Sequence, residues 1–302
     1  MFYAVAVESF TLPSFAKINL MLRVLGKRPD GFHELFTVFQ SVSLHDDITF
    51  RDGEGISLTC PNKSIPIDEK NLIVKAANLL QRHSGVDRGA SMHLTKRIPS
   101  PGGLGGGSSN AAVALIGLSR LWEIDESFDE LKGMAAEIGS DVPFFLHGGT
   151  AIGTGRGEEI EPIADIDPGH LLIVTPNVRV STPEAFKRLG AQNLTSEDLN
   201  RILIVCRLEA EKLDPRQSDL VNDIEAAVFA AHPEIKRVKR TLLDLGAANA
   251  MMSGSGASVF AVFEKEETRQ TALKALDDEV NWRKFAVAAV SRDEYREKLG
   301  IK

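Results

Sequence analysis

The sequence predicts an α+β protein with two domains, and three observations support this prediction. Two long N-terminal segments, residues 10–26 and 35–50, alternate in the way that antiparallel strands do. A strand pattern at residues 90–98 leads through a glycine-rich loop into a helix pattern. Near the C-terminus, residues 249–276 and 284–290 have the order strand, turn, strand, helix, strand, which suits helices packed on one face of an antiparallel sheet.

The first half of the chain begins with a predicted hairpin. Between its two strand segments, the Pro-Asp-Gly sequence at 29–31 is a turn signal, which places Phe32 and His33 at the edge of a loop. The next predicted element is a helix with apolar residues at helical spacing. Asn71 is its expected N-cap and Gly85 its expected stop.

A glycine-crowded loop, Pro99–Ala112, separates the strand from the helix in the middle of the chain. Glycines let the backbone adopt positive φ and approach an anion closely. Ser108, Ser109 and Asn110 can cap a helix whose N-terminus carries partial positive charge. Several amides then converge on one oxyanion, so we interpret the loop as a phosphate cradle. Flexible linkers also use Gly and Ser, but regular apolar elements on both sides count against that alternative.

Spacing excludes the two commonest glycine-loop templates. The P-loop requires Lys after its second spaced glycine, but Ser108 follows Gly107. A dinucleotide-binding fingerprint that begins at Gly103 and Gly105 requires a small, glycine-like residue where Ser108 stands, and no acidic partner follows at the usual distance. We therefore expect neither a P-loop fold nor a Rossmann dehydrogenase.

Two further helix starts are expected after the loop. Ser127 and Glu130 have capping-box spacing for a helix that ends near Gly139, and Ser140 with Asp141 marks the next start.

The composition then changes at the acidic, proline-containing residues 161–169, which predict an inter-domain connection. We expect domains over residues 1–162 and 163–302. The second domain begins with a buried strand at residues 170–176 and includes a helix at residues 196–213.

Composition and charge limit the classes of partner. A net charge of −7 and a pI near 5.6 argue against a general nucleic-acid or membrane-surface binder, so an anionic ligand requires a local positive site. The N-terminal segment has no basic region before an apolar core, and no later run approaches ~18 apolar residues, so we expect a cytoplasmic protein. Cys60 and Cys206 are expected to be buried thiols, outside any disulfide or zinc site.

Four clusters are candidates for chemistry: Lys17, the loop Gly102–Ser109, Asp141 and a second glycine motif, Ser253–Ser258. Each has a simpler explanation when it is taken alone. A strand lysine is usually solvated, an Asp before a short helix is usually a cap, and Gly-Ser-Gly between apolar strands forms a hairpin turn. Their joint appearance in this order favours a common site.

This set of motifs resembles the GHMP kinase superfamily, named for its galactose, homoserine, mevalonate and phosphomevalonate kinases. PSPGGLGGGSSNAA is similar to the ATP-phosphate loop of the superfamily, and MSGSGASVFAVF is similar to its C-terminal glycine motif. Within the superfamily, AKINLMLRVLGKRPDGFHEL, GSDVPFF and STPEAF resemble the 4-diphosphocytidyl-2-C-methyl-D-erythritol kinases. The resemblance implies an N-terminal ATP-binding domain like domain 2 of ribosomal protein S5 and a C-terminal ferredoxin-like α/β sandwich.

The resemblance also implies a reaction, in which ATP phosphorylates the tertiary 2-hydroxyl of 4-diphosphocytidyl-2-C-methyl-D-erythritol in the non-mevalonate route to isopentenyl diphosphate. Asp141 matches the catalytic aspartate, which accepts the hydroxyl proton. Lys17 matches the catalytic lysine, whose cation keeps the aspartate ionised and stabilises the transferring phosphoryl group. ATP is the co-substrate, and Mg²⁺ is expected with it, although no carboxylate is an obvious dedicated ligand.

Binding residues follow from the same resemblance. Phe32 and Phe186 would flank the cytosine ring, and edge hydrogen bonds from His33 would select it. The family usually has Tyr where Phe32 stands, and this change keeps the stacking face. It more often has an apolar residue and glycine where Ser100 and Pro101 stand, and a proline offers no amide proton to a phosphate. The implied substrate-binding residues are Asn19, Phe32, His33, Thr182, Pro183 and Phe186. Those implied for ATP are Asn71, Leu72, Lys96, Pro99, Gly102, Gly103, Leu104, Gly105, Gly106, Gly107, Ser108 and Ser109, with Gly254, Ser255 and Gly256 of the second glycine motif beside the phosphates.

Two other functions stay open on the sequence alone. Another small-molecule kinase of the superfamily would share the phosphate machinery and use a different alcohol. A non-catalytic nucleotide-binding or RNA-binding protein is the alternative from a different class, because part of this fold is shared with ribosomal domains. Lys17, Asp141 and the acidic charge count against it. We expect a monomer or homodimer that acts on small molecules, without nucleic-acid or membrane partners.

Overall fold

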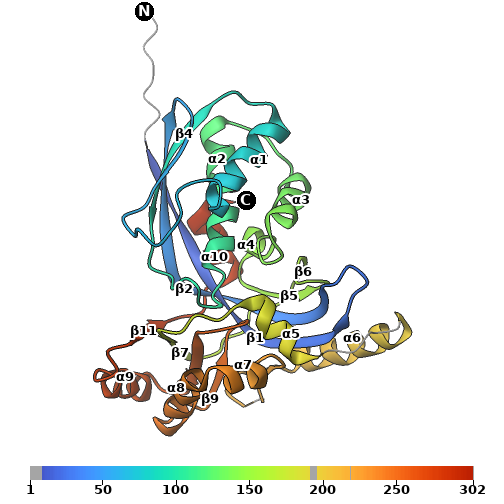
Figure 1. Cartoon of the computed structure of the whole chain (residues 1–302), viewed down its shortest axis with the longest axis vertical. Coiled ribbons are helices and arrows are strands. Elements are labelled where there is room, and N and C mark those ends of the chain that lie inside the picture. Colours follow the sequence, from blue (N-terminus) through green and yellow to red (C-terminus); the bar gives the residue numbers. More distant parts are fainter. Residues whose placement is uncertain (1–8, 191–195, 218, 302) are drawn as a thin grey trace, which may run out of the picture.

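The computed structural model describes residues 9–190, 196–217 and 219–301. Two sheets, each covered by helices on its outer face, form the two halves of the molecule, and a long hairpin runs between them (Figure 1). The expected absence of a leader segment concerns residues 1–8, which lie outside the described residues. No helix in the described ranges combines the length and the apolar character needed to cross a bilayer.

The long hairpin consists of β1 (Phe10–Lys27) and β2 (His33–Gly53), which pair antiparallel as predicted. Its turn is also confirmed, because Gly31 has a φ of +85° and the Arg28 amide donates to the Phe32 carbonyl at 2.8 Å. The strands are long enough to contribute to both halves. One end packs under the helices of the first half, and the other end packs against the second sheet.

The first sheet has the strand order β3-β4-β2-β1-β8, with β5 paired to β2 and β6 paired to β5. β2 changes partners along its length, since its first part pairs with β5 and its last part with β4. Strands β3, β5, β6 and β8 are not predicted from the sequence, because two to five residues are too few to show a period. Their bounds, with the predicted β4, are β3 (Ile56–Thr59), β4 (Gly89–Thr95), β5 (Thr150–Thr154), β6 (Glu159–Pro162) and β8 (Val221–Asn222).

Four helices cover the outer face of this sheet, and two predicted caps are confirmed. The Asn71 side chain accepts the amide of Ile73, and Gly85 ends the same helix in the left-handed conformation. Ser127 and Glu130 form the expected capping box. The helices are α1 (Leu72–Ser84), α2 (Gly106–Trp122), α3 (Phe128–Ile138) and α4 (Phe144–His147).

The start of α2 differs from the prediction. Ser108, Ser109 and Asn110 were the expected caps, but the N-cap is Gly105, at a φ of +68° and with no side-chain cap. Glycine adopts this conformation without steric cost, so the chain enters the helix at Gly106 and the three polar residues lie inside the first turns. The backbone amides of the first turn therefore receive no hydrogen bond partner from a capping side chain.

The second half is a four-stranded antiparallel sheet with the order β11-β7-β10-β9. Helices α8 and α9 pack on one face, and the other face meets the long hairpin. This is the expected ferredoxin-like sandwich. The strands are β7 (His170–Pro176), β9 (Asn249–Met252), β10 (Val259–Phe263) and β11 (Trp282–Val287). The helices are α5 (Thr182–Leu189), α6 (Ser196–Glu211), α7 (Glu225–Ala231), α8 (Pro233–Asp244) and α9 (Glu266–Ala275).

The last helix, α10 (Arg292–Leu299), returns to the first half, where Figure 1 shows the C-terminus beside α2 and α3. The buried Tyr295 hydroxyl donates to the Phe145 carbonyl at 2.6 Å, and Arg120 of α2 donates to the Leu299 carbonyl. We propose a boundary near residue 162, with α10 assigned to the first domain. This assignment modifies the expected division into residues 1–162 and 163–302.

The two cysteines are both free thiols. Cys206 is buried, as expected, and burial raises the pKa of its thiol. The prediction that Cys60 is buried is wrong, because this residue is only partly buried, next to the short strand β3.

Candidate active site

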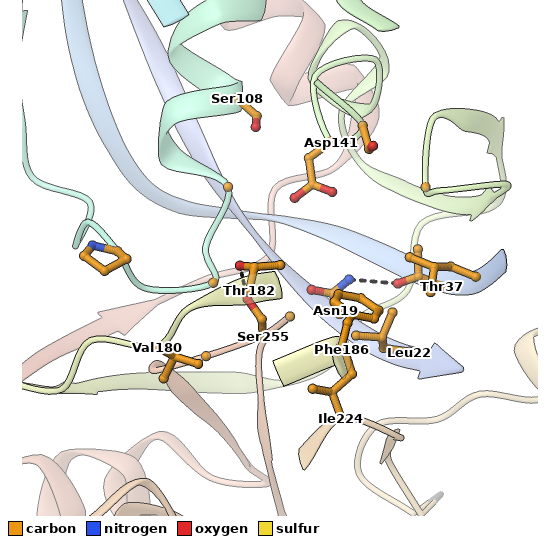
Figure 2. Close-up of a pocket in the computed structure, with 18 of the residues that line it drawn as sticks. Asn19, Leu22, Thr37, Ser108, Asp141, Val180, Thr182, Phe186, Ile224 and Ser255 are labelled. Carbon is orange, nitrogen blue, oxygen red and sulfur yellow. Dashed lines mark hydrogen bonds between the residues drawn. The ribbon is translucent and has the colours of Figure 1, made fainter. Parts of the chain in front are cut away.

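A cavity of about 890 Å³ lies where the two halves meet. Its walls come from segments far apart in sequence: the hairpin turn, the glycine loop, the turn before α4, α5 and the second glycine motif. This volume is in the range of small-molecule sites. Figure 2 shows Ser108 and Asp141 on one side of the cavity, with Asn19, Phe186 and Thr182 opposite them.

Lys17 and Asp141 meet inside this cavity, 3.5 Å apart between Nζ and Oδ2. Lys17 is 3% exposed, and its Nζ also donates to Asn19 Oδ1 at 2.6 Å. The Asn19 amide donates in turn to Thr37, as the dashed line in Figure 2 shows. Asp141 lies in the turn before α4, whose N-cap is Pro143, so the interpretation of Asp141 as a helix cap is wrong. The two charges stabilise each other at a position open to a ligand.

The amino end of α2 faces the same cavity. Within the described residues, the amides of Gly106, Gly107 and Ser108 make no hydrogen bond inside the chain. Helix N-termini carry partial positive charge and free donors, so they bind phosphate groups. The loop is held in place by β1, because the Lys17 amide donates to the Leu104 carbonyl at 3.0 Å. This contact places the lysine and the anion site side by side.

The second glycine motif lies against the glycine loop. The Ser258 amide donates to the Gly102 carbonyl at 3.1 Å, and the Ser253 hydroxyl donates to the Gly103 carbonyl at 2.9 Å. A Cβ at Gly103, where φ is +72°, would lie 2.1 Å from the backbone carbonyl oxygen of Ser253, so only glycine fits there. Gly254, Ser255 and Gly256 all line the cavity.

Aromatic side chains gather at the other end of the cavity. The rings of His33 and Phe186 stack with centroids 5.1 Å apart, and burial lowers the pKa of His33, which keeps the ring neutral at pH 7. Phe32 is 54% exposed, and the Arg156 guanidinium lies 5.1 Å from its ring centre. Phe186 faces His33 in this structure, and both Phe32 and Phe186 line the cavity, so the flanking of cytosine by these two rings stays a prediction. Thr182 and Pro183 lie beside this group.

Three of the residues implied for ATP do not line the cavity. The Asn71 side chain caps α1 and donates to the Pro66 carbonyl. Ser109 is fully buried and accepts a hydrogen bond from Ser14. Lys96 is buried beneath the loop, where its Nζ lies 2.5 Å from Asp46. These side chains are occupied in holding the loop, whereas Leu72, Pro99 and Gly102–Ser108 do line the cavity.

Asp46 is a site residue that the sequence does not predict. Its carboxylate is fully buried and accepts hydrogen bonds from Lys96, from the amides of Arg97 and Ile98, and from the Asn110 side chain. Burial lowers the pKa of the Lys96 ammonium, and the Asp46 charge opposes that shift. The carboxylate thus joins both ends of the glycine loop. The only signal for Asp46 in the sequence is its acidic side chain within a predicted strand whose apolar residues alternate with polar ones.

The described residues contain no group of three or more His, Cys, Asp and Glu side chains placed to hold a metal ion. Among these residues, Asp141 is the one carboxylate that lines the cavity. This arrangement suits a metal that arrives with phosphate oxygens and keeps its waters, which is how Mg²⁺ usually binds.

Comparisons with known proteins identify the family and the fold. The family described as GHMP kinases N terminal domain matches residues 71–149, and the one described as GHMP kinases C terminal matches residues 207–281. The crystal structure of a homoserine kinase from Cytophaga hutchinsonii, 21% identical, shares the fold with a TM-score of 0.72 over 97% of this chain and 98% of that chain. The chain has the fold and the two domains of a GHMP kinase, a class that uses ATP.

Relatives with higher sequence identity show which family of GHMP kinases this chain belongs to. The crystal structure of a 4-(cytidine 5'-diphospho)-2C-methyl-D-erythritol kinase is 31% identical, with a TM-score of 0.75 over 93% of this chain and 99% of that one. The 4-diphosphocytidyl-2-C-methyl-D-erythritol kinase of Pelodictyon phaeoclathratiforme is 40% identical over 88% of this chain and 92% of the relative. The enzyme of the same name from Bacillus pumilus is 39% identical over 86% of this chain and 90% of the relative. This chain belongs to the 4-diphosphocytidyl-2-C-methyl-D-erythritol kinase family.

Proposed function

We propose that this protein transfers the γ-phosphoryl group of ATP to the 2-hydroxyl of 4-diphosphocytidyl-2-C-methyl-D-erythritol, giving the 2-phosphate and ADP, in the non-mevalonate route to isopentenyl diphosphate. The observation that carries the proposal is the contact between Lys17 Nζ and Asp141 Oδ2, 3.5 Å long, beside α2 amides that make no hydrogen bond with the described part of the chain. An aromatic group lines the other end of the same cavity. One cavity therefore offers a base, an anion site and a surface for a nucleobase.

The proposed mechanism needs little covalent chemistry from the protein. Asp141 accepts the proton of the attacking hydroxyl as the new O–P bond forms and the bond to the β-phosphate oxygen breaks, releasing ADP. Lys17 keeps Asp141 ionised and stabilises charge on the transferring oxygens. A tertiary alcohol is a crowded nucleophile, so most of the rate enhancement must come from in-line positioning and charge stabilisation.

We place the ATP phosphates on the amides of Gly106, Gly107 and Ser108, where the α2 dipole favours negative charge. Leu72 at the start of α1 then lies on the side of the adenosine. Mg²⁺ would enter bound to ATP, and Ser108 offers it a hydroxyl oxygen next to the phosphates. It would neutralise charge on the phosphate oxygens. Because the reaction draws on ATP, we also propose a cytoplasmic location.

Cytidine recognition is assigned to the aromatic end of the cavity. The neutral His33 has one donor and one acceptor nitrogen, so its ring can pair with the edge of cytosine. Phe32 and Phe186 offer faces for stacking, and Thr182 and Pro183 lie close by. Rotation of Phe186 away from His33 would open a slot between the aromatic rings.

The test is ADP release by the purified protein with ATP and 4-diphosphocytidyl-2-C-methyl-D-erythritol, in parallel with mevalonate, homoserine and galactose. We expect turnover only with the cytidyl substrate, and its loss in Asp141→Asn. Turnover of another alcohol instead would support a kinase activity but refute the substrate assignment. ATP binding with no turnover of any alcohol would support a non-catalytic nucleotide-binding protein.

A further inference from the structure

The second glycine motif, Ser253–Ser258, is fixed by a buried side chain from another part of the chain. Asn222 is the last residue of β8 and is 8% exposed. Its Nδ2 donates to the carbonyls of Met252 and Gly254, each at 2.8 Å. A side-chain amide nitrogen carries two hydrogens, so these two bonds use both of them. Asn222 therefore holds the backbone on both sides of Ser253.

The turn that follows β8 is anchored to β1 on its other side. β8 pairs with β1 in parallel, with Asn222 opposite Leu22. The Asp223 amide donates to the Leu22 carbonyl at 2.9 Å, and the Asp223 carboxylate accepts the Val24 amide at 2.8 Å. Asn222 Oδ1 accepts the Ile224 amide at 3.0 Å, and Ile224 lines the cavity (Figure 2). The turn therefore joins β1 to the second glycine motif.

The backbone that Asn222 holds packs against two parts of the proposed phosphoryl-transfer machinery. A Cβ at Gly254 would lie 3.3 Å from Lys17 Nζ and 3.2 Å from the Gly103 carbonyl oxygen, so this backbone lies close to both the lysine and the glycine loop. The Ser253 hydroxyl, which stands between the two carbonyls that Asn222 binds, donates to the same Gly103 carbonyl. A shift of the motif would therefore reach the lysine and the loop together.

We propose that Asn222 is a positioning residue for phosphoryl transfer, which sets the place of the second glycine motif against Lys17 and the glycine loop. Asn222 itself does not line the cavity, so it acts through the backbone that it binds. The inference rests on the proposed function, which assigns Lys17 to the transferring phosphoryl group. Its physical basis is the cost of a buried carbonyl without a donor. Without the Asn222 amide, the two carbonyls lose their donors, and the backbone around Ser253 must shift to reach water or another donor.

Calorimetric titration with ATP and steady-state kinetics of the purified full chain test this role. We expect Asn222→Ala to lower kcat, referred to the ATP sites that calorimetry counts, by about 10²-fold, the scale of a small misplacement of reacting groups. We also expect ATP binding to weaken by about 10-fold, the value of about one hydrogen bond. A residue that only stabilised the fold would lower the number of ATP sites and leave their affinity unaltered.

A second variant and a matched control complete the experiment. Asn222→Ser keeps an acceptor for the Ile224 amide, but its hydroxyl has one hydrogen and cannot bond two carbonyls. It should lower kcat and ATP affinity as well, and it decides the test if Asn222→Ala does not fold. The control is Gln40→Ala, because the buried Gln40 amide also donates to two backbone carbonyls, at 2.9 and 3.2 Å, but does not contact the motif. It should lower the stability and leave ATP affinity unchanged.

The outcomes separate this inference from the proposed function. An unchanged kcat for each ATP site in the Asn222 variants would overturn it, and so would losses of the same size in Gln40→Ala. If the unaltered chain binds ATP but does not phosphorylate the cytidyl substrate, the proposed function is refuted. The ATP titration then decides the role of Asn222 alone, since it uses no alcohol, and an unchanged ATP affinity would overturn that role.

Discussion

Replacing Asp46 by Asn tests whether a buried charge holds the glycine loop. The change leaves one oxygen for the amides of Arg97 and Ile98, which lie 2.7 and 2.8 Å from Oδ1. It turns the second oxygen into a donor that faces Lys96 at 2.5 Å and the Asn110 amide at 3.0 Å. An unpaired ammonium is left inside the protein, and breaking a buried pair in this way costs about 3–5 kcal/mol.

Urea unfolding of Asp46→Asn measures this loss of free energy of unfolding. The matched control is Asp52→Asn, because Asp52 forms an exposed ion pair with Arg88 at 3.0 Å, worth about 0–1 kcal/mol. Since both ends of the loop meet at Asp46, the KM for ATP should also rise in Asp46→Asn, while the KM for the cytidyl substrate changes less. Equal stability of the two variants would refute the reasoning, and so would an unchanged KM for ATP.

Four further outcomes are expected. Asp141→Asn should lower kcat by about 10²- to 10⁴-fold with little change in ATP affinity, as steady-state kinetics will show, and Lys17→Met should also lower kcat. Gly103→Ala places a Cβ 2.1 Å from a backbone oxygen, so calorimetry should find ATP binding lost. Phe186→Ala should raise the KM for the cytidyl substrate by about 5- to 150-fold, the value of one stacked base, and leave the KM for ATP unchanged. Burial lowers the pKa of His147 to about 4 from 6.5. As the pH falls, the unfolded chain therefore takes up a proton at His147 before the folded chain does. Thermal unfolding should show that the stability of the unaltered chain falls between about pH 6.5 and 4, and that the stability of His147→Gln falls less.

Much of the local structure could be predicted, because it depends on neighbouring residues. The long hairpin, the caps Asn71 and Ser127, and the order of elements after residue 249 all follow from periods and turn signals within short windows. Prediction was wrong at the α2 cap, where the glycine backbone at Gly105 took the place of a side-chain cap. Short strands such as β8 could not be predicted, since only pairing with β1 makes them strands.

Resemblance to a family, carried by Lys17, Asp141 and the glycine motifs, indicated the type of chemistry, and the structure then brings these residues together. It also separates residues that the resemblance grouped, since Lys96 lies beneath the loop on Asp46 and does not line the cavity. Arg156 has no signal in the sequence that links it to Phe32, more than a hundred positions away.

The long strands, most helices, their order and the family can be recognised from the sequence, because propensity, period and motif spacing are properties of neighbouring residues. Which charges share a cavity, and which are paired inside the fold, depends on tertiary packing. The pairing of Lys17 with Asp141, of Lys96 with Asp46 and of Arg156 with Phe32 depends on how two sheets and a long hairpin pack. Electrostatic and ring contacts act over a few ångströms, so they exist only after packing has brought distant segments together.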